Sequence, residues 1–219
     1  MFRRALPLVL LSSTMRVSYA TMPLARVRHP APAWSAPAAS PDLTLTQISS
    51  DAFRNKYLVM VFYPRDFTFV CPTELTAFSD SLDKFKELGA DVVGVSVDSE
   101  HAHLAWMKMK RSEGGVEGLR IPLIADVKKE ISEKYGVLHD DGTALRGMFI
   151  IDKKGELRVA HINDFPIGRS VDEAIRLLEA IRFTDEHGEV CPANWKKGMP
   201  TMKDNPVDCK EYFSHVKDY

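Results

Sequence analysis

Short apolar runs recur along the chain and are separated by segments with a different periodicity. The runs at residues 58–63, 91–97 and 121–124 are short and rich in β-branched and aromatic side chains, which is typical of buried strands. Two later runs, at residues 145–151 and 156–162, lie on either side of a Lys-Lys-Gly turn and therefore predict a β-hairpin.

Between these runs, apolar residues are spaced as in helices. Positions 75, 78, 82 and 85 carry Leu or Phe and form one apolar face, which predicts a helix that begins near Pro72 and ends at Gly89. Ser170, followed three residues later by Glu173, has the pattern of a capped helix start. Helices are accordingly expected over residues 72–88, 99–111, 127–135 and 170–183.

The order of these elements defines the fold class that we expect. Strands and helices alternate as β-α-β-α-β-α-β-β-α, which predicts an α/β domain with a mixed central sheet and helices on both faces. With right-handed connections this is a thioredoxin-like fold, and we expect it to occupy residues 42–184. Residues 185–219 are rich in Gly, Pro and Lys and contain Trp195, Tyr212 and Phe213, so they predict a C-terminal tail that forms an arm.

The chain before residue 42 differs in composition from the rest. Residues 30–41 contain four prolines, and they predict an extended Pro/Ala-rich linker with no strand or helix, so that folding begins near residue 42. Residues 1–29 contain five arginines, several hydroxyl side chains and no acidic residue. This is typical of a transit segment, so we expect import into the mitochondrial matrix or a plastid-type organelle. A secretory signal and a disordered basic tail are the alternatives.

Composition and charge exclude several classes of function. The net charge is -1, and it becomes -6 without the five N-terminal arginines, so no basic excess points to nucleic acid. The sequence lacks an apolar stretch of about 18 residues, and we therefore expect no ordinary membrane span. The three cysteines exclude a disulfide-dense scaffold and a four-cysteine zinc site within one chain. They are Cys71, Cys191 and Cys209.

Cys71 lies at the point where the first long strand is followed by a helix. A thiol at a helix N-terminus meets unpaired backbone N–H groups and the positive end of the helix dipole, and both favour the thiolate. Thr68, three residues earlier, can exchange a hydrogen bond with the sulfur. Position 74 is Glu rather than Cys, so these residues form no Cys-x-x-Cys dithiol. They predict a single reactive thiolate that needs a distant partner thiol.

The segments around these residues resemble a known family. Residues 62–74 read Phe-Tyr-Pro-Arg-Asp-Phe-Thr-Phe-Val-Cys-Pro-Thr-Glu and resemble the active-site segment of typical two-cysteine peroxiredoxins. Residues 145–152 and 163–170 are similar to two arginine motifs of that family, and residues 188–195 are similar to its resolving-cysteine motif. The resemblance covers about residues 56–215, which is most of the expected globular part.

The resemblance implies a thiol-dependent peroxidase that reduces hydrogen peroxide and organic hydroperoxides. Cys71 would attack the peroxide O–O bond and become a sulfenic acid. Cys191 of a second subunit would condense with it to give an intersubunit disulfide, which a thioredoxin or thioredoxin-like protein would reduce. No metal, haem or flavin cofactor is implied. Cys209 matches no motif of the family, and we expect it to be a bystander, with a second resolving thiol as the alternative.

The resemblance also assigns roles to five residues around Cys71. Arg146 would stabilise the thiolate and bind a peroxide oxygen, because its guanidinium has a fixed charge and a fork of donors. Thr68 would orient the peroxide and the thiolate, and Pro64 would shield the sulfur from water. Glu74 would hold Arg146 through a charge-assisted hydrogen bond, and Arg169 would complete that network.

The resemblance leaves more than one function open. It implies a homodimer that assembles into decamers or dodecamers, with Phe67 as a candidate interface residue. A holdase chaperone or a peroxide-sensing relay on the same ring is the main alternative to a peroxidase, and an inactive adaptor is a third interpretation. His101, His103 and His161 lack ligand spacing with the cysteines, and we expect them to be structural or surface residues.

Overall fold

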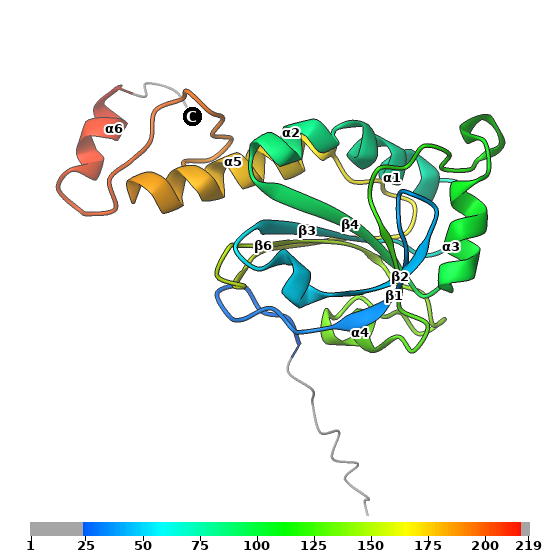
Figure 1. The fold of residues 1–219 in the computed structure, drawn as a ribbon. Helices are drawn as coiled ribbons and strands as arrows, with labels where there is room; N and C mark the ends of the chain where they lie inside the picture. The colour runs from blue at the N-terminus through cyan, green and yellow to red at the C-terminus, as the bar shows by residue number, and fades with distance from the viewer. Residues whose placement is uncertain (1–23, 216–219) are drawn as a thin grey trace, which may run out of the picture.

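The computed structural model describes residues 24–215 and builds them around one seven-stranded sheet (Figure 1). The strands are β1 (Ser35–Ala39), β2 (Leu45–Ser49), β3 (Tyr57–Phe62), β4 (Ala90–Ser96), β5 (Leu123–Ala125), β6 (Arg146–Ile151) and β7 (Leu157–Asn163). Their order is β2-β1-β5-β4-β3-β6-β7. β3, β4 and β5 are parallel, whereas β1, β2, β6 and β7 pair in antiparallel fashion, so the sheet is mixed as predicted.

Helices cover both faces of this sheet, which confirms the predicted fold class. The helices are α1 (Cys71–Asp80), α2 (Leu82–Glu87), α3 (Glu100–Met107), α4 (Glu130–Lys134), α5 (Val171–His187) and α6 (Cys209–His215). Alternate residues of β3 point to opposite faces: Val59 and Val61 pack with α1, α2, α3 and α5, whereas Leu58 and Met60 pack with α4. No helix within residues 24–215 is both long enough and apolar enough to cross a lipid bilayer.

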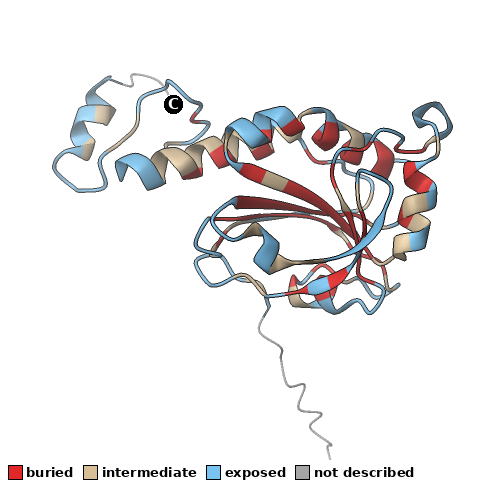
Figure 2. Cartoon of the chain, viewed as in Figure 1, coloured by how far each residue is buried: buried red, intermediate tan, exposed pale blue. Residues whose placement is uncertain are grey.

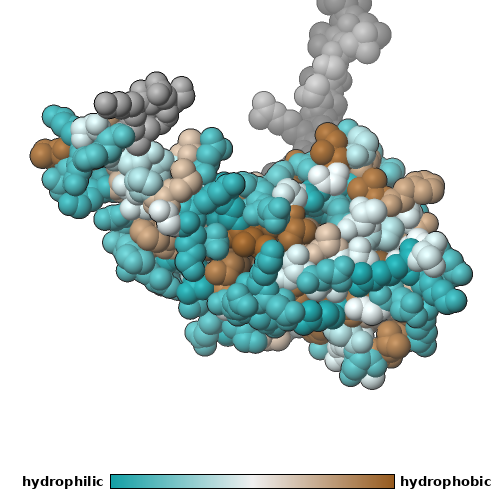
Figure 3. Space-filling model, turned by 90° about the horizontal axis from the view of Figure 1, so that it is seen from above, coloured by the Kyte–Doolittle hydropathy of each residue, from teal (hydrophilic) through white to brown (hydrophobic). Residues whose placement is uncertain are grey.

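Burial is concentrated in the central strands. Every residue of β3 and of β6 is buried, because helices cover one face and α4 with the N-terminal segment covers the other (Figure 2). This explains why both strands are continuous apolar runs rather than alternating ones. The outer surface above α1, α2 and α5 is mainly hydrophilic, with hydrophobic side chains gathered in a few places (Figure 3).

The helix predicted from residue 72 to residue 88 is present as two helices. α1 ends at Asp80 and α2 begins at Leu82, with Ser81 at φ -91° and ψ 7° between them. The break leaves the apolar face intact, since the side chains at positions 75, 78, 82 and 85 all lie in the same core cluster. The spacing therefore predicted the buried face correctly and missed the interruption.

The expectation that residues 30–41 form a linker without an element is wrong. They contain β1, which lies inside the sheet between β2 and β5. Trp34, Ala36 and Ala38 are buried, whereas Ser35 and Pro37 are exposed, so the segment has the two-residue period of a strand. Small side chains fit against the neighbouring strands, and Pro37 occupies an outward position.

The ordered structure also begins before residue 30. The backbone N–H of Ala25 donates to the carbonyl of Lys134, and that of Arg28 donates to the carbonyl of Leu157. Residues 24–29 therefore pack against the domain, and folding begins well before residue 42. Residues 1–23, which make up most of the expected targeting segment, lie outside the described residues.

The C-terminal arm extends from the end of α5 (Figure 1). Ser170 caps the start of α5 by accepting a hydrogen bond from the Glu173 N–H, as predicted, and Gly188 ends the helix with a left-handed φ of 71°. Trp195 is 1% exposed and packs on Phe183 with 5.2 Å between ring centroids. Beyond this contact the arm is thinly packed, and α6 has no buried residue (Figure 2).

We predict that Ala38→Asp destabilises the protein by about 3 kcal/mol or more, because it places an unpaired charge in the middle of the sheet. Pro37→Asp, one residue away on the outward side of β1, should change the free energy of unfolding by less than about 1 kcal/mol. Urea denaturation followed by circular dichroism measures both. Equal stability of the two variants would show that β1 does not belong to the folded sheet.

Candidate active site

Cys71 is the first residue of α1 and is almost completely buried. β3 ends at Phe62, and the chain then passes through a loop over residues 64–70, called here the active-site loop, before α1 begins. The Cys71 side chain therefore lies at the N-terminus of a ten-residue helix, and Pro72 occupies the first turn without loss of a helical hydrogen bond. Val70 offers no capping oxygen, so the positive end of the helix faces the sulfur rather than a capping group.

Two side chains contact the sulfur directly. The Thr68 hydroxyl lies 2.9 Å from Cys71 Sγ and 2.9 Å from the Arg65 carbonyl oxygen. A hydroxyl has one hydrogen, so it donates that hydrogen to the sulfur when the sulfur is a thiolate. Arg146 Nη1 lies 3.5 Å from the same sulfur. Both groups can therefore donate a hydrogen bond to this sulfur.

The Glu74 carboxylate holds two arginines beside Cys71. It accepts a hydrogen bond of 2.6 Å from Arg146 Nη1 and bonds of 2.7 and 3.0 Å from Nε and Nη2 of Arg169. The exposed fractions of the three side chains are 2% for Glu74, 5% for Arg146 and 0% for Arg169. One carboxylate between two guanidinium groups leaves one positive charge in excess, and this charge lies against the sulfur.

A main-chain carbonyl accepts a further hydrogen bond from each of the two arginines. Arg146 Nε donates to the carbonyl of Phe165 at 2.6 Å, and Arg169 Nη1 donates to the carbonyl of Gly147 at 2.6 Å. The Glu74 carboxylate also accepts a 2.7 Å bond from the backbone N–H of Arg169. Buried charges that are paired and hydrogen-bonded in this way keep one orientation. The network joins α1, β6 and the segment that precedes α5.

An open pocket of about 410 Å³ lies over Cys71. Four of the seven predicted site residues line it, namely Pro64, Thr68, Cys71 and Arg146, while Glu74 and Arg169 support it from the buried side. Sequence reasoning did not assign roles to several other residues of the wall. These are Arg65, Phe69, Val70, Asp141, Thr143, Phe165 and Pro166. Proximity in sequence to Cys71 pointed to the first three, and Phe165 and Pro166 lie in the second arginine motif, whereas no local pattern marked Asp141 or Thr143.

The structure does not bring Cys191 to this pocket. Cys191 is half-buried on the arm, where its sulfur lies 3.8 Å from the Ala180 carbonyl and 3.8 Å from the Thr184 hydroxyl of α5. It is not among the residues that line the Cys71 pocket. Cys209 is the first residue of α6. Within the chain that the structure describes, all three cysteines are free thiols.

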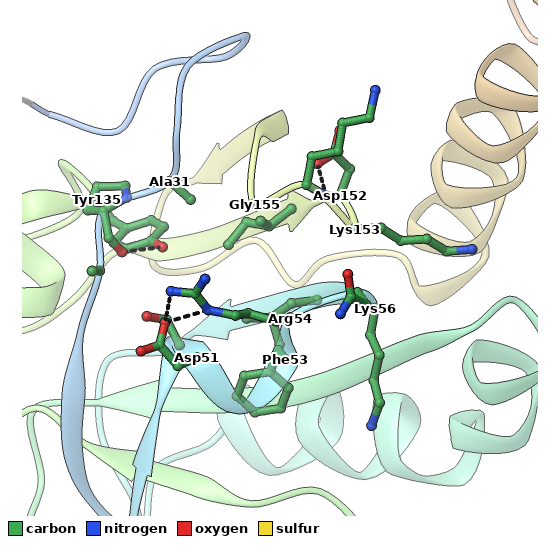
Figure 4. Close-up of a pocket in the computed structure, with 16 residues that line it drawn as sticks. Ala31, Asp51, Phe53, Arg54, Lys56, Tyr135, Asp152, Lys153 and Gly155 are labelled. Atoms are coloured by element: carbon green, nitrogen blue, oxygen red, sulfur yellow. Dashed lines mark hydrogen bonds and ion pairs between the residues drawn. The ribbon is translucent and has the colours of Figure 1, made fainter.

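A larger cavity of about 530 Å³ lies where the N-terminal segment meets the β6–β7 turn (Figure 4). No cysteine lines it, and its charged groups are largely paired with each other or with neighbours. Arg54 is 2.8 Å from Asp51, Lys56 is 3.0 Å from Asp91, and Lys153 lies over the Tyr57 ring. Residues 24–215 also contain no cluster of three or more His, Cys, Asp and Glu side chains arranged to hold a metal ion. The thiol pocket is therefore the candidate active site.

Comparison with known proteins places this site in a family. The sequence model of the AhpC/TSA family matches residues 27–160, and that of the C-terminal domain of 1-Cys peroxiredoxin matches residues 180–215. Peroxiredoxin-2 of Mus musculus is 57% identical over 185 residues, which cover 80% of this chain and 93% of that protein. Peroxiredoxin-1 of Gallus gallus is 51% identical over 192 residues, which cover 87% of this chain and 96% of that protein.

Solved structures agree with the sequence relatives. The reduced 2-Cys peroxiredoxin of Plasmodium vivax superposes with a TM-score of 0.84 at 40% identity, and the match covers 86% of this chain and 98% of that chain. The mitochondrial 2-cys peroxiredoxin of Plasmodium falciparum gives 0.73 at 39% identity, with 76% and 100% covered. Sequence, fold and site geometry lead to one conclusion: the chain belongs to the AhpC/TSA family and is a peroxiredoxin, a thiol-dependent peroxidase.

Proposed function

We propose that Cys71 is the thiolate that reduces hydrogen peroxide and organic hydroperoxides. The observation that carries this proposal is the contact of its sulfur with both Thr68 and Arg146 at the base of an open pocket. The thiolate attacks one peroxide oxygen, a sulfur–oxygen bond forms, and the O–O bond breaks. Sulfur is oxidised by two electrons to the sulfenic acid, and the leaving oxygen takes a proton and departs as water or an alcohol.

The surrounding residues stabilise the charge that moves during this step. Negative charge shifts from sulfur to the leaving oxygen during the reaction. Arg146 and the N-terminus of α1 lie beside the sulfur, where their positive charge stabilises it. The Thr68 hydroxyl orients the reactants, and Pro64 covers the sulfur from the loop side. Glu74 and Arg169 do not touch the sulfur in the structure; they hold Arg146 in place through the buried ion network.

We propose that Cys191 of a second subunit resolves the sulfenic acid. Its thiolate forms a disulfide with Cys71 and releases the sulfenic oxygen as water. Its position on a thinly packed arm, away from the Cys71 pocket of the same chain, supports an intersubunit reaction. A thioredoxin or thioredoxin-like dithiol then reduces this disulfide by exchange. Solved relatives described as 2-Cys peroxiredoxins support the same cycle.

We further propose a homodimer that assembles into a decamer or dodecamer. β7 is an edge strand whose first residue, Leu157, pairs with residues 28–29. Over residues 158–163 no other strand of the described chain pairs with its outer side, and Ile162 is exposed, so this stretch is a template for pairing with a second chain. Phe67 and Phe69 of the active-site loop are 53% and 92% exposed, which provides apolar surface for a further contact.

We propose import into the mitochondrial matrix, on the acid-free and arginine-rich composition of residues 1–29. A fusion of residues 1–40 to a fluorescent protein should enter mitochondria. Replacement of its five arginines by glutamine should abolish import. Delivery of the fusion to a plastid-type organelle or to the secretory pathway would contradict the proposal in favour of one of those alternatives.

The cysteine cycle predicts a specific pattern of disulfides. One equivalent of hydrogen peroxide should convert the reduced protein into a dimer on a non-reducing gel, with Cys71 joined to Cys191 in the peptide map. Cys71→Ser should abolish both the dimer and peroxide turnover, whereas Cys209→Ser should leave both unchanged. Cys191→Ser should leave a monomer with Cys71 oxidised. A dimer linked through Cys209 would refute the assignment of Cys191.

The buried ion network predicts that Glu74→Gln slows peroxide reduction by about 10²-fold, because Arg146 loses the partner that fixes it. The same change should destabilise the fold by about 3–5 kcal/mol, since two buried arginines are left without a carboxylate. Glu173→Gln removes a surface pair with Arg176 and should cost less than about 1 kcal/mol and leave the rate unchanged. Stopped-flow oxidation and urea denaturation distinguish the two; equal rates would refute the role of Glu74.

A further inference from the structure

The active-site loop is anchored on its buried side by a polar network. The Asp66 side chain is 1% exposed and does not line the Cys71 pocket. Its Oδ1 accepts a hydrogen bond of 2.8 Å from the Tyr63 hydroxyl, and its Oδ2 lies 2.8 Å from His103 Nδ1. Burial, reinforced by the charge of Asp66, raises the pKa of Tyr63 well above its ordinary value, so this hydroxyl keeps its hydrogen and donates it.

His103 connects this loop to two other elements. It lies on α3 with no exposed surface, and its ring packs beside the end of β3. Because a carboxylate accepts hydrogen bonds, Nδ1 carries the hydrogen in the contact with Asp66. Nε2 lies 3.3 Å from the carbonyl of Ile124 on β5. His103 is therefore a buried structural residue, as expected, and the residue that it contacts, Asp66, belongs to the active-site loop.

Adjacent contacts hold the loop at two successive residues. The backbone N–H of Asp66 donates to Asp98 Oδ2 at 2.8 Å. Phe67 has a φ of 56°, a left-handed conformation that costs about 1–2 kcal/mol for a residue with a Cβ, and its ring packs on Trp106 of α3 at 6.0 Å. Such a conformation persists only where the surroundings fix it.

The anchored residues lie inside the turn that positions Thr68. The Thr68 hydroxyl contacts both the Arg65 carbonyl and the Cys71 sulfur, so Asp66 and Phe67 form the middle of that turn. A shift of Asp66 therefore moves the hydroxyl relative to the sulfur. A displacement of about 1 Å in a reacting geometry is enough to cost about 10²-fold in rate.

We propose that Asp66 and His103 are positioning residues of the peroxidase reaction, whose hydrogen bond fixes the active-site loop so that the Thr68 hydroxyl stays on the Cys71 sulfur. Neither side chain touches the sulfur, and both act through Thr68. The inference rests on the proposed roles of Cys71 and Thr68 and adds a buried set of residues that supports them from the side opposite to Glu74.

The test compares two reactions of the same thiol in the full chain. We expect Asp66→Asn and His103→Leu to slow the oxidation of Cys71 by hydrogen peroxide by about 10²-fold, because that reaction needs the Thr68 hydroxyl in place. Alkylation of Cys71 by iodoacetamide needs the thiolate but not this orientation, and it should change by less than about threefold. His103→Asn places an amide donor near the position of Nδ1 and should restore most of the peroxide rate.

Asp152→Asn provides a matched control. Asp152 is also buried and accepts hydrogen bonds from the Lys154 and Glu156 N–H groups and from Arg158, but it follows the far end of β6 from Arg146. It should lower the urea midpoint while the peroxide rate stays at the wild-type value. If His103→Leu does not fold, Asp66→Asn alone carries the comparison.

Three results would overturn the proposal. Wild-type peroxide rates in Asp66→Asn and His103→Leu, with stability lowered as in Asp152→Asn, would show that the network serves folding only. An equal fall of the peroxide and alkylation rates would show that it acts on the thiolate itself and not through Thr68. A wild-type chain whose Cys71 does not react with peroxide would instead refute the proposed role of Cys71, and that outcome is recognised before any variant is measured.

Discussion

The structure depends on one carboxylate, that of Glu74, which lies between the guanidinium groups of Arg146 and Arg169. The three side chains are buried and come from α1, β6 and the segment before α5. Removing one partner of such a network leaves an uncompensated charge in the interior, which costs about 3–5 kcal/mol. The same ions that join these elements therefore also fix the charge beside the sulfur. The Glu74 carboxylate therefore serves both the stability of the fold and the position of Arg146 beside the sulfur.

The sulfur is consequently held between two buried polar networks. Glu74 and its arginines lie on one side, and the group formed by Asp66, His103 and Tyr63 lies behind the active-site loop on the other. The two networks meet at Cys71, through Arg146 on one side and Thr68 on the other. Each is nearly sealed from solvent, so its electrostatic interactions are strong and its geometry is well defined.

The chain divides into a well-packed part that contains Cys71 and a thinly packed part that contains Cys191. Cys71 belongs to the core cluster, whereas Cys191 lies on the arm, which contacts the domain chiefly through Trp195 and α5. Segments with few buried contacts open at a low cost in free energy. The intersubunit disulfide proposed above would use this low cost, because Cys191 can leave α5 without opening the core cluster that contains Cys71.

The sequence by itself determined the features that depend on neighbouring residues. Apolar periodicity predicted the buried strands and the hairpin, and the order Thr68, Cys71, Pro72, Glu74 placed a thiol at a helix N-terminus, because these relations extend over a few residues. The resemblance to peroxiredoxins added Arg146 and Arg169, which lie 72 and 95 residues from Glu74 and which no local rule could have joined to it.

Only the tertiary structure decided the rest. The prolines of residues 30–41 predicted a linker in place of β1. The alternating burial of Trp34, Ala36 and Ala38 arises only when β2 and β5 pair with this strand on either side. In the sequence, nothing distinguishes Asp66 from other loop acids or His103 from other helical histidines. Their contact forms only because the fold places α3 behind the active-site loop. Local patterns reflect the backbone and its nearest turns, whereas contacts between distant side chains depend on how whole elements pack, and that packing appears only in the folded chain.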